Sequence, residues 1–135
     1  MAGDVLYLDA STLVKLVVSE AESGALGELV AESGAHASSI VAAVEVPRAV
    51  GRVTDAEAPL ERADRLLSML DLRVLDDEVV REARKAPRGL RSLDAIHLGS
   101  AITLGDALTA FVAYDRRLQA AARDLGLPLA APARG

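Results

Sequence analysis

The sequence predicts an α/β domain with a parallel sheet that helices cover on both faces. Short apolar runs of strand length alternate with longer segments in which apolar residues recur at helical spacing, a pattern typical of parallel sheets. Two of the runs end in an aspartate, Asp9 and Asp115, just before a helical pattern begins. With 135 residues, 51% of them hydrophobic, we expect a single domain at 1–130 and a C-terminal tail at 131–135 that frays.

The first part of the chain predicts two strands and three helices. VLYL is an apolar run that suits a buried strand, and the later helix beginning at Ile40 has Ser38 or Ser39 as its N-cap. Pro47 falls inside that helix, where its missing N–H bends the axis. The five elements are expected at 5–8 (strand), 11–20 and 21–33 (helices), 35–38 (strand) and 40–52 (helix).

The second part of the chain predicts four helices and three strands. The run TDAEAP reads as a turn, Asp76 opens a helix that stops near Pro87, and Ser92 caps the helix that follows. LPLA is expected as a last edge strand. The seven elements are expected at 60–71 (helix), 72–75 (strand), 76–86 and 93–105 (helices), 110–114 (strand), 116–126 (helix) and 127–130 (strand).

The composition limits how the protein could bind nucleic acid. A net charge of −5, from 15 basic and 20 acidic residues, argues against a general phosphate-binding surface. Two tyrosines and one phenylalanine argue against recognition by stacked bases. Neither observation excludes an enzyme that acts on nucleic acid through a local site. If four candidate site acids are set aside, 15 basic residues face 16 acidic ones, so much of the excess acidity belongs to one site.

The absence of cysteine excludes disulfides, thiolate zinc sites and cysteine nucleophiles. The start MAGDVLYLDA lacks a basic segment and reaches Asp9 after a short apolar run, so we predict no signal peptide. Charges interrupt every apolar stretch before it reaches the length of a membrane span. We therefore expect a cytoplasmic protein with no membrane partner.

Glu45 interrupts the apolar run IVAAVEV, and the residues one helical turn away, Val41 and Ala49, are apolar. A carboxylate on a buried helix face is costly unless it is paired or binds a metal. Two alternatives remain open: Pro47 distorts the helix and exposes Glu45, or Arg48 pairs with it.

Asp94 lies near the apolar Leu98 and Ala101 on a helical wheel, so it is expected to point inward. The alternative is that an aspartate in the first helical turn only stabilises the helix dipole.

Asp9 and Asp115 each end a strand and precede a helix, where an aspartate serves either as an N-cap or as a ligand at the sheet edge. Four carboxylates meeting in one pocket would repel one another unless a cation compensates. Sites made only of carboxylate oxygens select Mg²⁺ or Mn²⁺, which can activate a water for phosphodiester hydrolysis.

The chain resembles PIN-domain ribonucleases, and among them the small VapC-type toxins of toxin–antitoxin pairs. The strings that carry the resemblance run nearly end to end, and the last two in their order are the most specific. They are VLYLDASTLVKL at 5–16, ASSIVAAVEVPRAV at 37–50, LRSLDAIHLGSA at 90–101 and FVAYDRRL at 111–118.

The resemblance assigns the four acids to one site. It implies that Asp9 and Glu45 match the family's first two acids and that Asp94 and Asp115 match the third and fourth. Ser11 matches a hydroxyl residue that supports the site. Two positions depart from the pattern: Ala113 replaces a Thr or Ser, which affects the tuning of the site, and Gly99 replaces a commoner Ala, which is expected to be neutral.

The resemblance also implies a fold and an activity. The fold is a three-layer α/β/α arrangement with a mostly parallel five-stranded sheet. The activity is that of an endoribonuclease dependent on Mg²⁺, or on Mn²⁺, which acts on tRNA or ribosomal RNA. The implied protein partners are a VapB-type antitoxin and a second copy of the chain in a homodimer.

Basic residues are concentrated near the candidate site. Five of them lie in the segment 81–91, just before Asp94, and Arg116 follows Asp115. Arg91 and Arg116 are therefore candidates for RNA contact, the alternative being a solvated helix end. His97 lies three residues after Asp94, but a histidine on a buried helix is usually a packing residue with its hydrogen bonds satisfied, so we interpret it that way.

Two other functions stay open. One is a PIN-like protein without catalysis that serves as a binding or autoregulatory partner. The other is phosphotransfer on Asp9, which the sequence disfavours because the run Asp9-Ala10-Ser11-Thr12 lacks the second aspartate of a DxDxT motif.

Overall fold

The structure is a computed structural model that describes residues 3–133. Strands and helices alternate along these residues, as the sequence predicts. In order they are β1 (Val5–Leu8), α1 (Ala10–Val17), α2 (Ser23–Glu32), β2 (Ala35–Ser39), α3 (Ala42–Val53), α4 (Glu57–Ser68), β3 (Asp71–Arg73), α5 (Asp77–Ala83), α6 (Ser92–Ile102), the 3-10 turn η1 (Gly105–Ala107), β4 (Leu108–Val112), α7 (Arg116–Asp124) and β5 (Leu129–Ala130).

The five strands form one sheet in the order β3-β2-β1-β4-β5, and every neighbouring pair is parallel. The first strand of the chain is therefore the central one. Tyr7 lies in register with Ala37 of β2 on one side and Phe111 of β4 on the other. Because all strands run the same way, the segments that follow β1, β2 and β4 emerge at one edge of the sheet.

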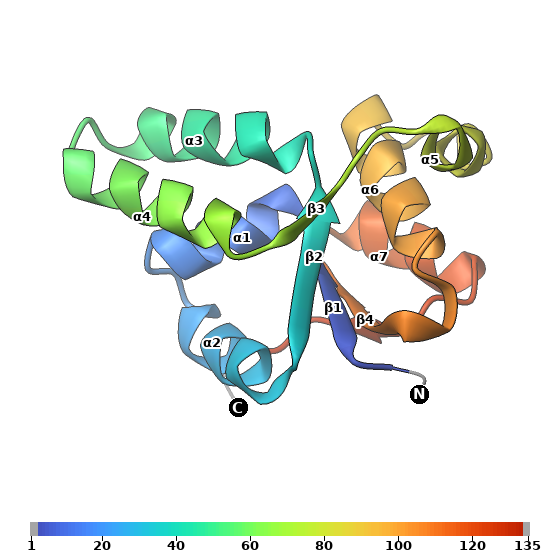
Figure 1. Cartoon of the computed structure of the whole chain (residues 1–135), viewed down its shortest axis with the longest axis horizontal. Coiled ribbons are helices and arrows are strands. Elements are labelled where there is room, and N and C mark those ends of the chain that lie inside the picture. The colour runs from blue at the N-terminus through green and yellow to red at the C-terminus, as the bar shows by residue number, and fades with distance from the viewer. Residues whose placement is uncertain (1–2, 134–135) are drawn as a thin grey trace.

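Helices cover both faces of the sheet, which confirms the three-layer α/β/α prediction. Helices α1 to α4 lie on one side and α5 to α7 on the other (Figure 1). Successive side chains of β1 point to opposite faces. Leu6 and Leu8 therefore join the core beneath α1 to α4, whereas Tyr7 joins the core beneath α6 and α7.

Several predicted boundaries were wrong. Helix α4 begins at Glu57, inside the run interpreted as a turn, and β4 begins at Leu108 and ends at Val112. Neither Ser38 nor Ser39 is an N-cap, because α3 starts later and its cap position is Val41. Ser92 is the first residue of α6 rather than its cap. These errors are local and leave the candidate site residues on the elements expected.

The expectation that Gly99 is a neutral departure from the family pattern was wrong. It lies in the middle of α6, where α6 packs against α5. A Cβ at this position would lie 2.8 Å from both the carbonyl oxygen of Val79 and the amide nitrogen of Ala83. The glycine is therefore what allows the two helices to approach so closely.

The last described residues, 131–133, follow β5 and contact Tyr114. The hydroxyl of Tyr114 donates a hydrogen bond of 2.6 Å to the carbonyl oxygen of Pro132. The expected frayed tail at 131–135 extends past this contact, and its last two positions lie outside the described residues. Within 3–133, no helix is both long enough and apolar enough to cross a membrane.

Candidate functional site

The four acids singled out by the sequence come from four elements that meet at the carboxyl edge of the sheet. Asp9 directly follows β1, and Asp115 follows β4. Glu45 lies in the first turn of α3 and Asp94 in the first turn of α6. The parallel sheet thus brings together residues that are far apart in the sequence.

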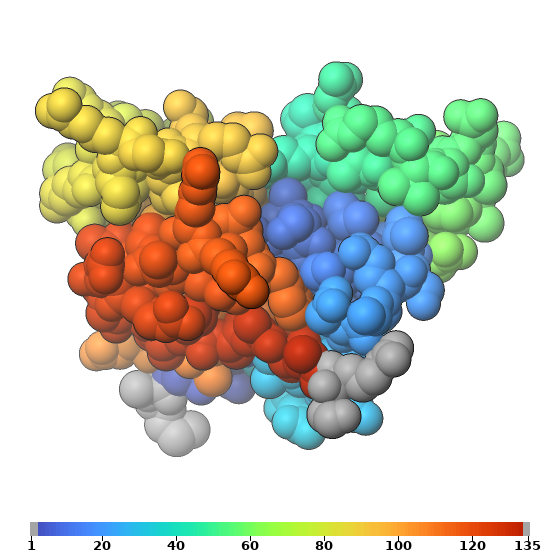
Figure 2. Space-filling view, turned by 180° about the vertical axis from the view of Figure 1, so that it is seen from behind, coloured from blue at the N-terminus to red at the C-terminus, as the bar shows by residue number. Residues whose placement is uncertain are grey.

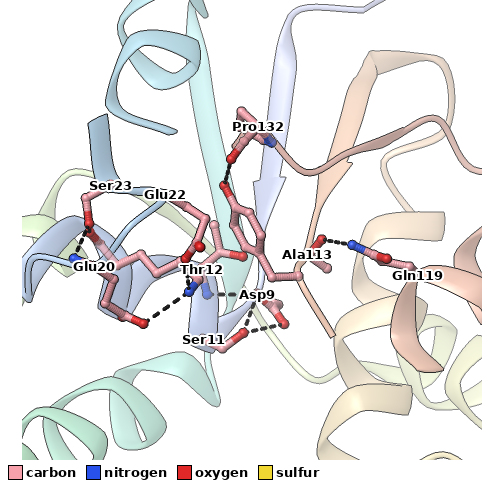
Figure 3. Close-up of polar contacts among 11 residues, drawn as sticks. Asp9, Ser11, Thr12, Glu20, Glu22, Ser23, Ala113, Gln119 and Pro132 are labelled. Carbon is pink, nitrogen blue, oxygen red and sulfur yellow. Dashed lines mark hydrogen bonds and ion pairs between the residues drawn. The ribbon is translucent and has the colours of Figure 1, made fainter. Parts of the chain in front are cut away.

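Asp9 is the most buried of the four, with 4% of its surface exposed. It is the N-cap of α1: its Oδ1 accepts from the backbone N–H of Thr12 at 3.0 Å, and the hydroxyl of Ser11 lies 3.2 Å from both carboxylate oxygens (Figure 3). Burial raises the pKa of Asp9, and hydrogen bonds from Thr12 and Ser11 oppose that rise. Ser11 supports Asp9 directly.

Asp115 is the N-cap of α7 and is exposed. Its Oδ1 accepts from the backbone N–H of Leu118 at 3.0 Å. The capping alternative is therefore confirmed for both strand-end aspartates. A cap engages one carboxylate oxygen, so it fixes the side chain without using all of its acceptor capacity.

Asp94 lies half-buried in the first turn of α6 and accepts from Arg91 Nε at 3.2 Å. The side chain of Asp94 is 14% exposed and that of Arg91 is 82% exposed. Asp94 therefore points inward as expected, while Arg91 extends over it from the solvent side. Arg116, the other candidate for RNA contact, lies exposed at the first position of α7.

Glu45 pairs with His97 rather than with Arg48. Its Oε1 lies 2.7 Å from Nε2 of His97, across the junction between α3 and α6. Pro47 is accommodated inside α3 and leaves the Glu45 side chain 22% exposed. Both alternatives considered for Glu45 are therefore wrong, because a histidine contributed by another element satisfies it.

Three of the four acids line two adjoining hollows, and Asp9 lies buried outside both. Asp94 and Asp115 share a cavity of about 280 Å³, whose other walls include Arg91 and Arg117. Glu45 and Ser11 line a second hollow of about 380 Å³ together with Arg48, Arg52 and Arg91. Arg91 belongs to both, so the hollows meet at this side chain. In Figure 2 the N-terminal part of the chain, in blue, lies between the residues of α3 and α4 in green and those around α5 and α6 in yellow.

The donor set fits a hard divalent cation in its chemistry. All four candidate ligands are carboxylates, and a cation beside Asp9 would offset the cost of burying its charge. In residues 3–133, however, no three acidic or histidine side chains are close enough to hold one metal ion together. Instead, Arg91 is hydrogen-bonded to one oxygen of Asp94, and His97 to one oxygen of Glu45.

Sequence reasoning missed the role of Tyr7 and of His97 beside the site. His97 is buried with both ring nitrogens hydrogen-bonded, which confirms that it is a satisfied core residue. Its partners are Tyr7 and Glu45, which no local pattern reveals. The only available signal was its place three residues after Asp94, one helical turn along α6.

Comparisons with known proteins show the family to which the chain is similar. A family model described as the PIN domain matches residues 6–124. The chain is 41% identical over 133 residues to "Ribonuclease VapC47" of Mycobacterium tuberculosis (strain CDC 1551 / Oshkosh), covering 95% of this chain and 97% of the relative. It is 40% identical over 128 residues to "Ribonuclease VapC46" of M. tuberculosis (strain ATCC 25618 / H37Rv), covering 94% and 97%.

Two solved structures share the fold at low identity. The crystal structure of M. tuberculosis VapC20, a toxin described as cleaving the sarcin-ricin loop, superposes with a TM-score of 0.69 at 19% identity, over 86% of this chain and 94% of that one. A chain of VapBC2 from Rickettsia felis, bound to a DNA fragment from its promoter, superposes with a TM-score of 0.71 at 16% identity, over 95% and 98%.

Proposed function

This chain belongs to the PIN-domain family as a VapC-type member, and we propose that it is a Mg²⁺-dependent endoribonuclease that acts as the toxin of a toxin–antitoxin pair. The observation that carries the proposal is the placement of Asp9, Glu45, Asp94 and Asp115 at one edge of the sheet, in a chain whose relatives of about 40% identity are named ribonucleases. Mn²⁺ is the alternative metal, because it accepts the same oxygen ligands.

Asp9, Asp94 and Asp115 are the residues that would hold the metal, with Glu45 completing the site. When bound, Mg²⁺ would lower the pKa of a coordinated water and neutralise charge on the scissile phosphate. Oε1 of Glu45 is hydrogen-bonded to His97. Oε2 is therefore left to orient the attacking water and accept its proton, or to bind a second metal. Ser11 and Thr12 hold Asp9 in place from α1.

Arginines around the two hollows supply the positive charge that an RNA backbone needs. Arg91 separates the hollows, Arg117 lines the cavity of Asp94 and Asp115, and Arg116 lies exposed beside it. Arg116 and Arg117 can contact phosphates on either side of the cleaved bond, and Arg91 can do so with its terminal amino groups while its Nε stays on Asp94. A chain with a net charge of −5 can therefore still bind RNA at this edge.

The proposed partners follow from the family. The R. felis structure is of VapBC2, which supports a VapB-type antitoxin as the partner of this chain. VapC20 is described as cleaving the sarcin-ricin loop, and we extend only the substrate class, tRNA or ribosomal RNA, to this chain. A homodimer and a cytoplasmic location complete the proposal.

RNA cleavage by purified protein free of antitoxin tests the proposal. We expect wild type to cleave with Mg²⁺ and to stop with EDTA, and Asp94→Asn to lose at least about 100-fold in rate, the scale of losing a positioned catalytic group. Asp124→Asn is the matched control, because Asp124 lies on α7 in a neighbouring hollow that does not include the four acids. Cleavage that persists in EDTA or in Asp94→Asn would contradict the site assignment.

The alternative, a PIN-like protein that binds without cleaving, predicts a different result. Wild type would then bind its antitoxin but leave RNA intact with either metal. Retention of all four acids favours the enzyme. Calorimetry with Mg²⁺ and Mn²⁺ on the same sample separates the two, because an inactive binding protein has no need of a metal.

A further inference from the structure

Resting on the proposed function, we propose that Tyr7 and His97 form a buried positioning pair that fixes the orientation of the Glu45 carboxylate for RNA hydrolysis. Neither residue belongs to the set of four acids. The contact between Glu45 and His97 joins the two helical layers, because Glu45 lies on α3 on one side of the sheet and His97 on α6 on the other (Figure 1).

The contacts form one continuous chain across three elements. Nε2 of His97, on α6, lies 2.7 Å from Oε1 of Glu45, on α3. Nδ1 of the same ring lies 2.8 Å from the hydroxyl oxygen of Tyr7, on β1. His97 is 1% exposed and Tyr7 is fully buried, so water does not compete for the contact between them, whereas the contact with Glu45 is partly buried.

The direction of each hydrogen bond follows from the chemistry of the groups. An ionised carboxylate can only accept, so Nε2 of His97 carries the hydrogen that it donates to Glu45. In the neutral ring Nδ1 is then the acceptor, and the Tyr7 hydroxyl donates to it. With both nitrogens engaged, the imidazole cannot turn without breaking a buried hydrogen bond.

Tyr7 is itself held by the sheet. Its ring stacks on Phe111 of the adjacent strand, with centroids 5.5 Å apart and planes inclined by 14°. It also meets the His97 ring edge to face, at 5.8 Å and 73°. The central strand therefore provides a rigid base from which the orientation of His97, and through it that of Glu45, is set.

The consequence for catalysis is that the Glu45 side chain is already held in one conformation before the reaction begins. One of its oxygens is held inside, while the side chain remains 22% exposed and lines the hollow that contains Ser11 and Arg91. Positioning of this kind contributes to rate because a displacement of about 1 Å at a reacting group can cost roughly 100-fold. His97 and Tyr7 act through Glu45 and are positioning residues rather than catalytic ones.

Steady-state kinetics on four variants tests the pair. His97→Leu should lower kcat by about 10- to 100-fold with little change in KM, and His97→Gln should recover part of the loss because its amide can donate to Glu45. Tyr7→Phe should lower kcat by a smaller factor. Tyr114→Phe is the matched control, because it also removes one tyrosine hydroxyl, but one that donates to the backbone of Pro132 rather than to His97.

A double-mutant cycle decides whether His97 acts through Glu45. In a Glu45→Gln background, His97→Leu should have almost no further effect on kcat. An equal fold-loss in both backgrounds would overturn the proposal, because His97 would then act independently of Glu45. Thermal melts of each variant exclude unfolding as the cause, and Tyr7→Phe keeps the test decisive if His97→Leu fails to fold.

A spectroscopic readout tests the pair without any activity. In the metal-free protein, ¹⁵N NMR of the His97 ring should show hydrogen on Nε2 and an acceptor Nδ1, and Tyr7→Phe should shift Nδ1 while Tyr114→Phe does not. Hydrogen on Nδ1 would overturn the proposed arrangement. If wild type has this NMR signature but cleaves no RNA, the proposed function fails and the contact chain stands.

Discussion

Replacing Gly99 with alanine should destabilise the protein, although alanine is the better helix former. The new Cβ would lie 2.8 Å from two backbone atoms of α5, whereas ordinary contact begins at 3.4 Å, so the helices must separate by about 0.6 Å. Overpacking of this kind costs roughly 1–3 kcal/mol, and the gain in helix propensity returns about 1 kcal/mol. The difference is a net loss of up to about 2 kcal/mol.

Urea and thermal unfolding measure this loss, and Gly51→Ala is the matched control. Gly51 lies exposed in α3, and a Cβ there meets nothing within 4 Å, so its substitution should stabilise by roughly 0.5–1 kcal/mol. A net loss of about 2 kcal/mol at Gly99 corresponds to a fall in Tm of about 6 °C. If Gly99→Ala stabilises as much as Gly51→Ala, the close approach of α5 and α6 is not what requires the glycine.

Three further outcomes follow from the site. Burial raises the pKa of Asp9, so the folded state binds a proton on this carboxyl more tightly than the unfolded state does. The free energy of unfolding of the metal-free protein should therefore fall as pH rises from the ordinary pKa of aspartate through the raised pKa of Asp9. Asp9→Asn should abolish this fall in urea titrations made across that range in EDTA. Mg²⁺ at roughly 100 times its Kd should stabilise wild type by about 2.7 kcal/mol in thermal melts and stabilise Asp94→Asn much less; equal stabilisation of both would place the metal elsewhere. Arg117→Ala should weaken binding of single-stranded RNA and reduce its log–log salt slope by about 0.7, whereas an unchanged slope in filter-binding assays would mean that Arg117 contacts no phosphate.

The order of strands and helices could be predicted because each element is marked by its own residues. VLYL and AFVAY are apolar runs of strand length, and each is followed by an aspartate that starts a helix. Glu45 and Asp94 could be singled out because each interrupts an apolar helix face. What these signals share is that they lie within one element.

The features that sequence reasoning missed depend on contacts between elements. The pairing of Glu45 with His97 joins residues 52 positions apart, and that of Tyr7 with His97 joins residues 90 apart. The need for Gly99 arises from the backbone of α5, which the sequence of α6 does not describe. Helix boundaries were missed for a different reason: TDAEAP contains turn-forming residues, but Ala56 and Glu57 begin a helix whose stability comes from packing on α3.

Capping and metal binding at the strand ends are compatible roles rather than competing ones. Asp9 and Asp115 each give Oδ1 to the amide three residues later, and this bond holds the carboxylate at the sheet edge. Asparagine keeps that acceptor and removes the charge, whereas alanine also removes the cap, which costs about 1 kcal/mol. Asp115→Asn should therefore retain the Tm of wild type in EDTA and lose activity, while Asp115→Ala should lose both. If the two variants melt alike, the cap contributes nothing and Asp115 acts in this structure through its charge alone.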